Sequence, residues 1–230
     1  TIVSTVSYTL APNFENLLLT GTDSITGVGN DDANYIEGNA ATNYLSGGLG
    51  ADTLKGNDGD DTYYVDSIFD VVIETNATRS VGGTDTIVST VSYTLAANFE
   101  NILLSGTDSI TGIGNDDANY IEGNAATNYL SGGLGADTMK GNDGDDTYYV
   151  DSIFDVIIET NANRATGGTD NVVSSVSYTL AANFENLLLT GTDSITGIGN
   201  DDANYIEGNA ATNYFSGGLG ADTLKGNGGD

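Results

Sequence analysis

The sequence predicts an all-β protein, a right-handed parallel β-roll or β-solenoid built from glycine- and aspartate-rich nonapeptides. Two observations carry this prediction. An 85-residue unit recurs, since TIVSTVSYTL at 1–10 returns at 86–95 and, as NVVSSVSYTL, at 171–180. A second period, of nine residues, lies inside each unit, with glycine and aspartate at constant places. Self-similarity at a fixed period is typical of stacked arrays, in which one unit cannot bury its apolar side alone.

One nine-residue frame fits residues 29–73. Position six is an acid or amide and position eight is apolar in all of its nonapeptides, and the frame recurs at 114–158 and from 199 onward. Dense glycine and the lack of a 3.6-residue apolar stripe exclude a helix, whereas a strand at positions seven to nine turns position eight inward. The remaining six residues form a turn, so that 18 residues complete one coil between two facing sheets. The nonapeptides are GNDDANYIE (29–37), GNAATNYLS (38–46), GGLGADTLK (47–55), GNDGDDTYY (56–64) and VDSIFDVVI (65–73).

The segments outside this frame repeat its acid-x-apolar signature at irregular spacing. We interpret Asn16-Leu17-Leu18, Asp23-Ser24-Ile25 and Asp85-Thr86-Ile87 as the strand starts of further coils with longer loops. The whole chain is then one continuous solenoid of three repeat units, 1–85, 86–170 and the truncated 171–230. Because the third unit stops inside the glycine-rich tract, we expect the chain to be a segment of a longer protein.

Two predictions concern the outer surface. Glu37 and Lys55, both at position nine of neighbouring coils, are expected to form a weak exposed ion pair about 4.8 Å apart along the stack. Val71 and Ile73 point outward beside Ile68 and Phe69, which is too apolar to be left in water. Either the register slips there or residues 74–84 cover the face, and the low hydrophobicity of 74–84 favours a loop.

The composition excludes several function classes. The chain has 33 acidic and 5 basic residues, a formal charge of -28, and no histidine, cysteine or tryptophan. Nucleic acid is excluded as a partner because phosphate binding needs clustered Lys or Arg. Disulfides and thiolate metal sites are excluded. No enzyme is expected, since histidine and cysteine are missing and the serines have no partner base. No apolar run of eighteen residues exists, so we expect no membrane insertion.

The turns offer the ligands of a hard cation such as Ca²⁺, which takes six to eight carboxylate and carbonyl oxygens. An ion between turns 18 residues apart, such as 29–34 and 47–52, 38–43 and 56–61, or 47–52 and 65–70, would join adjacent coils. The candidate side-chain ligands are Asp31, Asn34, Asn43, Asp52, Asp58, Asp60, Asp61, Asp70, Asp116, Asn119, Asn128, Asp137, Asp143, Asp145, Asp146, Asp155, Asp201 and Asp222. The candidate carbonyl ligands are Gly47, Leu49, Ala51, Gly56, Gly132, Leu134, Ala136, Gly141, Gly217, Leu219 and Ala221.

Charge repulsion in these turns couples folding to the cation. Like charges about 4 Å apart cost about 4 kcal/mol at an effective dielectric of 20, so a turn holding Asp58, Asp60 and Asp61 is opposed without its ion. Cation binding and folding are therefore expected to be one event. Asn34 and Asn43 offer neutral amides, so turns built on them are weaker sites, or the amides form a hydrogen-bonded ladder.

GGLGADTLK and GNDGDDTYY resemble the nonapeptide G-G-x-G-x-D-x-U-x of the RTX, or hemolysin-type, calcium-binding repeat, in which U is a large apolar residue. The match recurs 85 residues later and begins again in the third copy. The resemblance implies calcium between turns, held by the position-six aspartate and the carbonyls of the preceding loop. Those aspartates are Asp52, Asp61, Asp137, Asp146 and Asp222.

Two functions from different classes stay open. One is a stalk or filament segment of a large secreted or cell-surface RTX protein, which folds on calcium outside the cell and associates with copies of itself. The other is an adhesive module that binds glycans or a neighbouring cell through the outward Tyr35, Tyr44 and Tyr64. A disordered acidic tract and an ice-binding face are weaker alternatives, because the residues share one register and no sustained Thr-x-Thr ladder occurs.

Overall fold

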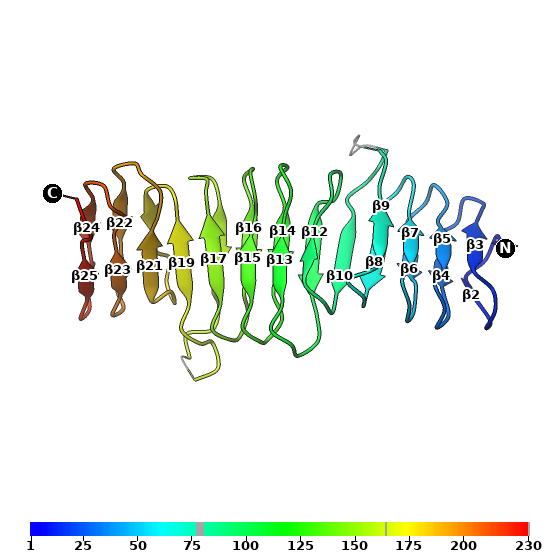
Figure 1. Ribbon diagram of the computed structural model, residues 1–230, viewed down its shortest axis with the longest axis horizontal. Coiled ribbons are helices and arrows are strands. Elements are labelled where there is room, and N and C mark those ends of the chain that lie inside the picture. The colour runs from blue at the N-terminus through cyan, green and yellow to red at the C-terminus, as the bar shows by residue number, and fades with distance from the viewer. Residues whose placement is uncertain (77–80, 164, 230) are drawn as a thin grey trace. The chain divides into compact units, whose positions relative to one another are not determined.

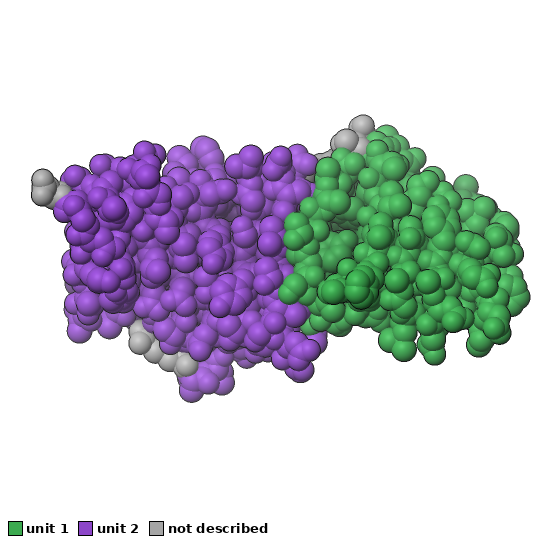
Figure 2. Space-filling view, viewed as in Figure 1, with its two compact units in different colours: residues 1–105 green, residues 106–230 purple. Residues whose placement is uncertain are grey.

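The protein is all-β, as predicted. The computed structural model describes residues 1–76, 81–163 and 165–229. These residues form 25 strands and no helix, and accordingly none of them belongs to a helix that could span a membrane. They divide into two compact units, Thr1–Ser105 and Gly106–Asp230 (Figure 2).

The first unit is a parallel β-solenoid. Strands β1, β3, β5, β7 and β9 form one sheet, and β12, β10, β8, β6, β4 and β2 lie in that order in another (Figure 1). Successive strands thus alternate between facing sheets, as the two-nonapeptide coil requires. The strands are β1 (Ile2–Ser4), β2 (Tyr8–Thr9), β3 (Asn16–Leu19), β4 (Thr26–Val28), β5 (Tyr35–Glu37), β6 (Tyr44–Ser46), β7 (Thr53–Lys55), β8 (Thr62–Val65), β9 (Val71–Ile73), β10 (Thr86–Ser89), β11 (Tyr93–Thr94) and β12 (Asn101–Leu104).

The second unit follows the same plan. Its sheets are β18-β16-β14, β13-β15-β17-β19-β21-β23-β25 and β20-β22-β24. Its strands are β13 (Thr111–Ile113), β14 (Tyr120–Glu122), β15 (Tyr129–Ser131), β16 (Thr138–Lys140), β17 (Thr147–Val150), β18 (Val156–Ile158), β19 (Asn171–Ser174), β20 (Tyr178–Thr179), β21 (Asn186–Leu189), β22 (Thr196–Ile198), β23 (Tyr205–Glu207), β24 (Tyr214–Ser216) and β25 (Thr223–Lys225).

The core is a column of position-eight side chains between the facing sheets. Ile36 pairs with Leu54 and Leu45 with Tyr63, so residues 18 positions apart lie on neighbouring strands. All four side chains are fully buried. The frame predicted for residues 29–73 is therefore confirmed, and each coil contributes only its inward side chains to the core.

Two of the three irregular strand starts were predicted in the wrong register. Leu17, not Leu18, pairs with Ile36 and fills position eight, so Glu15 stands at position six. Gly27 pairs with Leu45 and takes position eight of β4, which places Ile25 at position six. The physical reason is space: a Cβ on Gly27 would approach the side chains of Ile36, Leu19 and Leu17 within 2.9–3.3 Å, so these neighbours already fill the column. The third prediction is correct, since Ile87 pairs with Tyr63.

The predicted surface contacts follow from the same register. Lys55 donates to Glu37 over 2.8 Å, and both side chains are about a quarter exposed, a geometry in which an ion pair adds little stability. The register does not slip at β9, because Val72 is buried while Val71 is 51% exposed beside Ile68 at 72% and Phe69 at 70%. The predicted covering loop 74–84 includes residues 77–80, which lie outside the described residues.

Replacing Leu54 by alanine tests the column. The Leu54→Ala variant loses a fully buried side chain in a close-packed position, and we expect it to lower the free energy of unfolding by about 2–5 kcal/mol. Urea denaturation in saturating calcium measures the loss. The matched control is Leu49→Ala, which changes a leucine that is 62% exposed and should stay within about 0.5 kcal/mol of the parent. Equal effects of the two variants would contradict the assigned core.

Candidate metal centre

Position six precedes each strand, so the parallel register stacks these residues in two rows along each unit. In the first row, which we call the Asp52 row, the Asn34 N–H donates to Asp52 Oδ1 over 2.7 Å and the Asp52 N–H to Asp70 Oδ1 over 3.0 Å. In the opposite row, the Asp61 row, the Asn43 N–H donates to Asp61 Oδ1 over 2.6 Å. One carboxylate oxygen of each acid thus accepts a hydrogen bond from a backbone N–H of the preceding coil.

The Asp61 row continues beyond the nonapeptides. The Asp61 N–H donates to Asp85 Oδ1 over 2.8 Å, and the Asp85 N–H donates to Glu100 Oε2 over 2.8 Å. Asp85 was predicted to begin a strand but was not predicted to be a ligand, and Glu100 was missed. The signal for Asp85 was present, because it stands two residues before the inward Ile87.

The second oxygen of the central acids has no partner. Among the described residues, Oδ2 of Asp52, Asp61, Asp137 and Asp146 is buried without a hydrogen bond, and these four residues are at most 1% exposed. A buried carboxylate oxygen without a partner is costly, and native proteins retain one mainly where something binds it. The two rows therefore fit a hard cation at the central aspartates of the first two copies, whereas Asp222 in the third copy is half-buried.

Glycine at position one makes room for these carboxylates. A Cβ on Gly47 would overlap the Asp52 carboxylate, and a Cβ on Gly29 would overlap the Gly47 carbonyl oxygen of the adjacent turn. The Gly56 carbonyl stands in the same relation to Gly38. The predicted carbonyls of Gly47 and Gly56 therefore point towards the neighbouring turn, and Gly132, Gly141 and Gly217 repeat the loop position in the later copies.

Several predicted ligands lie away from the buried rows. The side chains of Asp31, Asp116 and Asp201 are exposed. Exposed residues also supply six of the predicted carbonyl ligands, whose role as ligands stays a prediction: Leu49, Ala51, Leu134, Ala136, Leu219 and Ala221.

Two further pairs of predicted ligands form hydrogen bonds with the long loop that follows β9 or β18. Asp58 accepts from Asn76 Nδ2 over 2.9 Å, and Asp60 from the Thr84 N–H over 2.8 Å. Asp143 and Asp145 make the same bonds with Asn161 and Thr169. Their position in the sequence beside Asp61 and Asp146 gave no indication of this, because the partners come from the next coil.

The amides at position six are satisfied within the protein. Asn43 Oδ1 accepts from the Asn39 N–H over 2.7 Å, while its Nδ2 donates to Ile25 O over 3.2 Å and to Asn39 Oδ1 over 3.0 Å. Asn34 is bonded similarly to Asn30 and Phe14. Of the two alternatives for these turns, the geometry favours the hydrogen-bonded ladder, and Asn119 and Asn128 occupy the equivalent places.

The electrostatics oppose charge in the rows when no cation is present. Burial, aided by neighbouring acids, raises the pKa of Asp61 to about 8 and that of Asp85 to about 7. The same cause raises the pKa of Asp52 and of Asp137 to about 6. Burial likewise raises the pKa of Asp146 and that of Asp170 to about 7. In the metal-free fold, these acids therefore bind protons at a higher pH than ordinary aspartates do.

A pH dependence follows from these raised pKa values. The folded pKa lies above the ordinary aspartate value, so the metal-free folded chain binds more protons than the unfolded chain, and its stability falls as pH rises from about 4 to about 8. We expect more strand structure in chelator at about pH 5.5 than at about pH 8.5, measured by circular dichroism. With the double variant Asp61→Asn/Asp146→Asn the difference should shrink. A chelated parent that has less strand structure at the lower pH would contradict the assignment.

Comparison with known families identifies the repeat. The model of the RTX calcium-binding nonapeptide repeat (4 copies) matches residues 28–63, 113–151 and 198–230. Comparison with curated proteins gives no match. The matched segments contain the central acids of both rows, and the RTX repeats bind Ca²⁺. In every one of its three copies, the chain carries the RTX calcium-binding nonapeptide repeat that the sequence resembles.

Proposed function

We propose that this chain is a calcium-rigidified stalk or filament segment of a large secreted or cell-surface protein. The observation that carries the proposal is the set of buried position-six carboxylates with an unpartnered oxygen, repeated in successive copies. A fold that leaves such oxygens buried needs a cation for stability. The ligand assignment follows the rows: Asp52, Asp61, Asp137 and Asp146, and Asp222 in the third copy, with the carbonyls of the preceding glycine-rich loops.

The bound ion would neutralise the row and join one coil to the next. The chain's own residues supply the rest: position-one glycines leave space for the carboxylates, and each acid already accepts a hydrogen bond from the coil before it. Glycines with positive φ, such as Gly48 at 82° and Gly59 at 110°, let the turn close tightly enough to stack. The buried acids thus have a structural role, and no residue is proposed to be catalytic.

Near identity of the copies supports a structural role over a recognition role. Residues 1–85 and 86–170 differ at nine positions, most of which preserve volume and polarity, so successive units have the same geometry. With a spacing of about 4.8 Å per coil, one 85-residue unit would add about 20 Å of solenoid. Uniform units of this kind suit length and lateral packing.

The location that we propose is extracellular. Cytosolic calcium is too scarce to neutralise the rows, so the chain would stay unfolded until export and fold in millimolar calcium. Coupling of metal binding to folding makes this a single step.

An adhesive module on the same scaffold is the second candidate. It is favoured by exposed aromatic side chains: Tyr44 is 39% exposed and packs at 4.4 Å, ring centroid to ring centroid, against Tyr64. Tyr129 and Tyr149 are 48% and 45% exposed at the equivalent places in the next copy. Aromatic faces of this kind could stack on the rings of surface glycans.

A calcium titration of the full chain tests the stalk proposal. We expect little strand signal in excess chelator at neutral pH and a cooperative gain with calcium, followed by circular dichroism. Small-angle scattering of the calcium-loaded chain should then show a rod. A full strand signal in chelator would contradict calcium-coupled folding, and a compact particle in calcium would contradict the stalk.

The double variant Asp52→Asn/Asp137→Asn tests the row itself. It removes two charges but keeps an oxygen that can accept the N–H bonds of Asn34 and Asn119. We expect the calcium concentration at the folding midpoint to rise about tenfold or more, equivalent to about 1.4 kcal/mol or more. Asp31→Asn/Asp116→Asn, the same change at exposed turn positions, is the control and should leave the midpoint in place. Equal midpoints for the two variants would refute the assigned ligands.

A further inference from the structure

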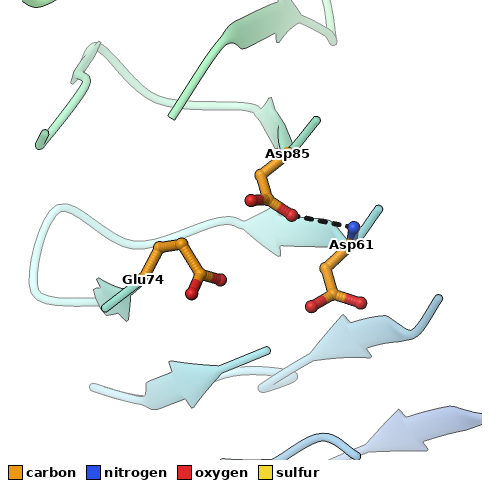
Figure 3. Close-up of side chains that lie close together, drawn as sticks. All are labelled: Asp61, Glu74 and Asp85. Atoms are coloured by element: carbon orange, nitrogen blue, oxygen red, sulfur yellow. Dashed lines mark hydrogen bonds between the residues drawn. The ribbon is translucent and has the colours of Figure 1, made fainter. Parts of the chain in front are cut away.

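A second type of carboxylate cluster lies where the 85-residue unit leaves the nine-residue frame. Asp61, Glu74 and Asp85 bring one carboxylate oxygen each within 4.8 Å of one another, and the three residues are 1%, 8% and 1% exposed (Figure 3). Asp146, Glu159 and Asp170 form the same cluster in the next copy, at 0%, 7% and 2% exposure. Only Asp61 and Asp146 belong to segments that match the RTX repeat.

The glutamate reaches the cluster because it replaces a glycine of the frame. Lys55 at the end of β7 lies opposite Ile73 at the end of β9, so Glu74 stands beside Gly56, at position one of its coil. In the four nonapeptides from 29 to 64 this position is glycine, and the position-six carboxylate or amide lies over it. A glutamate here adds a third carboxylate to the two that the Asp61 row supplies.

The cluster also has oxygens without partners. Asp61 Oδ2 in the first copy, and Asp146 Oδ2 and Glu159 Oε2 in the second, are buried and make no hydrogen bond within the described residues. A Cβ placed on Gly141 would meet Asp146 Oδ2, the Tyr148 hydroxyl and Glu159 Oε1 together, so three oxygens converge beside that glycine. The three lysines of the chain pair with Glu37, Glu122 and Glu207 instead.

Aromatic rings seal the cluster. The Tyr63 hydroxyl donates to Glu74 Oε2 over 3.1 Å, and the Tyr63 ring meets Phe99 edge to face at 5.6 Å. Tyr148 donates to Glu159 and packs against Phe184 at 5.3 Å in the same way. All four aromatic residues are buried, and they shield each cluster from water on the side of the core. Glu74 Oε1 also accepts from the N–H groups of Thr75 and Asn76, so the unpartnered oxygen of the first cluster is Asp61 Oδ2. Three converging buried carboxylates form an all-oxygen, strongly negative site, which suits a hard cation of the size and flexible coordination of calcium.

We propose that Asp61, Glu74 and Asp85 bind one calcium ion and that Asp146, Glu159 and Asp170 bind a second. Each of these ions is the one that the proposed function assigns to Asp61 or Asp146, and its site differs from the sites of Asp52 and Asp137 in taking a carboxylate from position one. The ions would join the loops after β9 and β18 to the preceding coil. Calcium is the expected ion because, as proposed above, the chain folds where calcium is millimolar.

The double variant Glu74→Gln/Glu159→Gln in the full chain tests this proposal. We expect equilibrium dialysis with calcium to find two fewer bound ions per chain, one for each cluster, with an unchanged strand signal in saturating calcium. An unchanged number of ions would overturn the proposal. If the double variant does not fold in saturating calcium, the single variant Glu159→Gln, which leaves the first cluster intact, is measured instead; it should bind one ion fewer than the parent, and an unchanged number would overturn the proposal.

Two controls separate ligation from packing. Glu37→Gln/Glu122→Gln makes the same change on the outer face and should keep every ion. Tyr63→Phe/Tyr148→Phe removes the hydroxyl bonds but leaves all carboxylates, and should also keep both ions; their loss would assign the effect to the tyrosine and overturn the proposal. Asp85→Asn/Asp170→Asn, which alters another ligand of each cluster, should reproduce the loss seen with glutamine.

The outcome is distinguishable from failure of the stalk proposal. If the parent chain keeps its full strand signal in chelator, calcium-coupled folding is wrong whatever the number of ions. If the parent folds on calcium and the glutamine variant loses no ion, only the carboxylate clusters are wrongly assigned.

Discussion

Parallel stacking of the position-six acids is the constraint on which the rest of this structure depends. The strand register places each acid above the one before it, where one oxygen is bonded to a backbone N–H and the other is buried. The same register places the apolar position eight inward two residues later. Within the nine-residue frame, core and charge therefore cannot be separated: every nonapeptide that adds its inward side chain to the column also adds an acid or amide to a row.

The core is thin, which explains why the rows matter for stability. Each nonapeptide buries one large side chain, such as Leu54 or Tyr63, while most of its turn remains at the surface. Glycine-rich turns lose much conformational entropy on folding. Hydrophobic burial alone leaves little margin over this cost, and buried, like-charged acids reduce the margin further. Cations bound along the rows would remove the repulsion between these acids, and the free energy of unfolding would then depend on calcium.

The long loops of the 85-residue unit extend the rows instead of interrupting them. From Asp61 the chain takes 24 residues, not 18, to reach Asp85, the next acid of the Asp61 row, and then 15 to reach Glu100. Asp58 and Asp60 bind this loop through Asn76 and Thr84, so the acids beside the row hold the detour in place. Glu74, at position one, joins Asp61 and Asp85 of this row in a cluster at the point where the nine-residue frame ends and the loop begins. The 85-residue period thus adds one cluster of three acids, in addition to the nonapeptide turns, to each of the first two copies of the repeat.

The sequence by itself determined the all-β class, the coil of two nonapeptides, the inward column from Ile36 to Val72, the Glu37–Lys55 pair and the calcium chemistry, because each depends on a short period that repeats without interruption. Only the tertiary structure decided what depends on neighbours 15 to 24 residues away. Leu17 rather than Leu18 faces inward, since packing against Ile36 selects it. Gly27 suffices at position eight because neighbouring side chains fill its space. The amide of Asn43 is satisfied by Ile25 and Asn39, and Glu74 comes to lie beside the Asp61 row only when β9 pairs with β7.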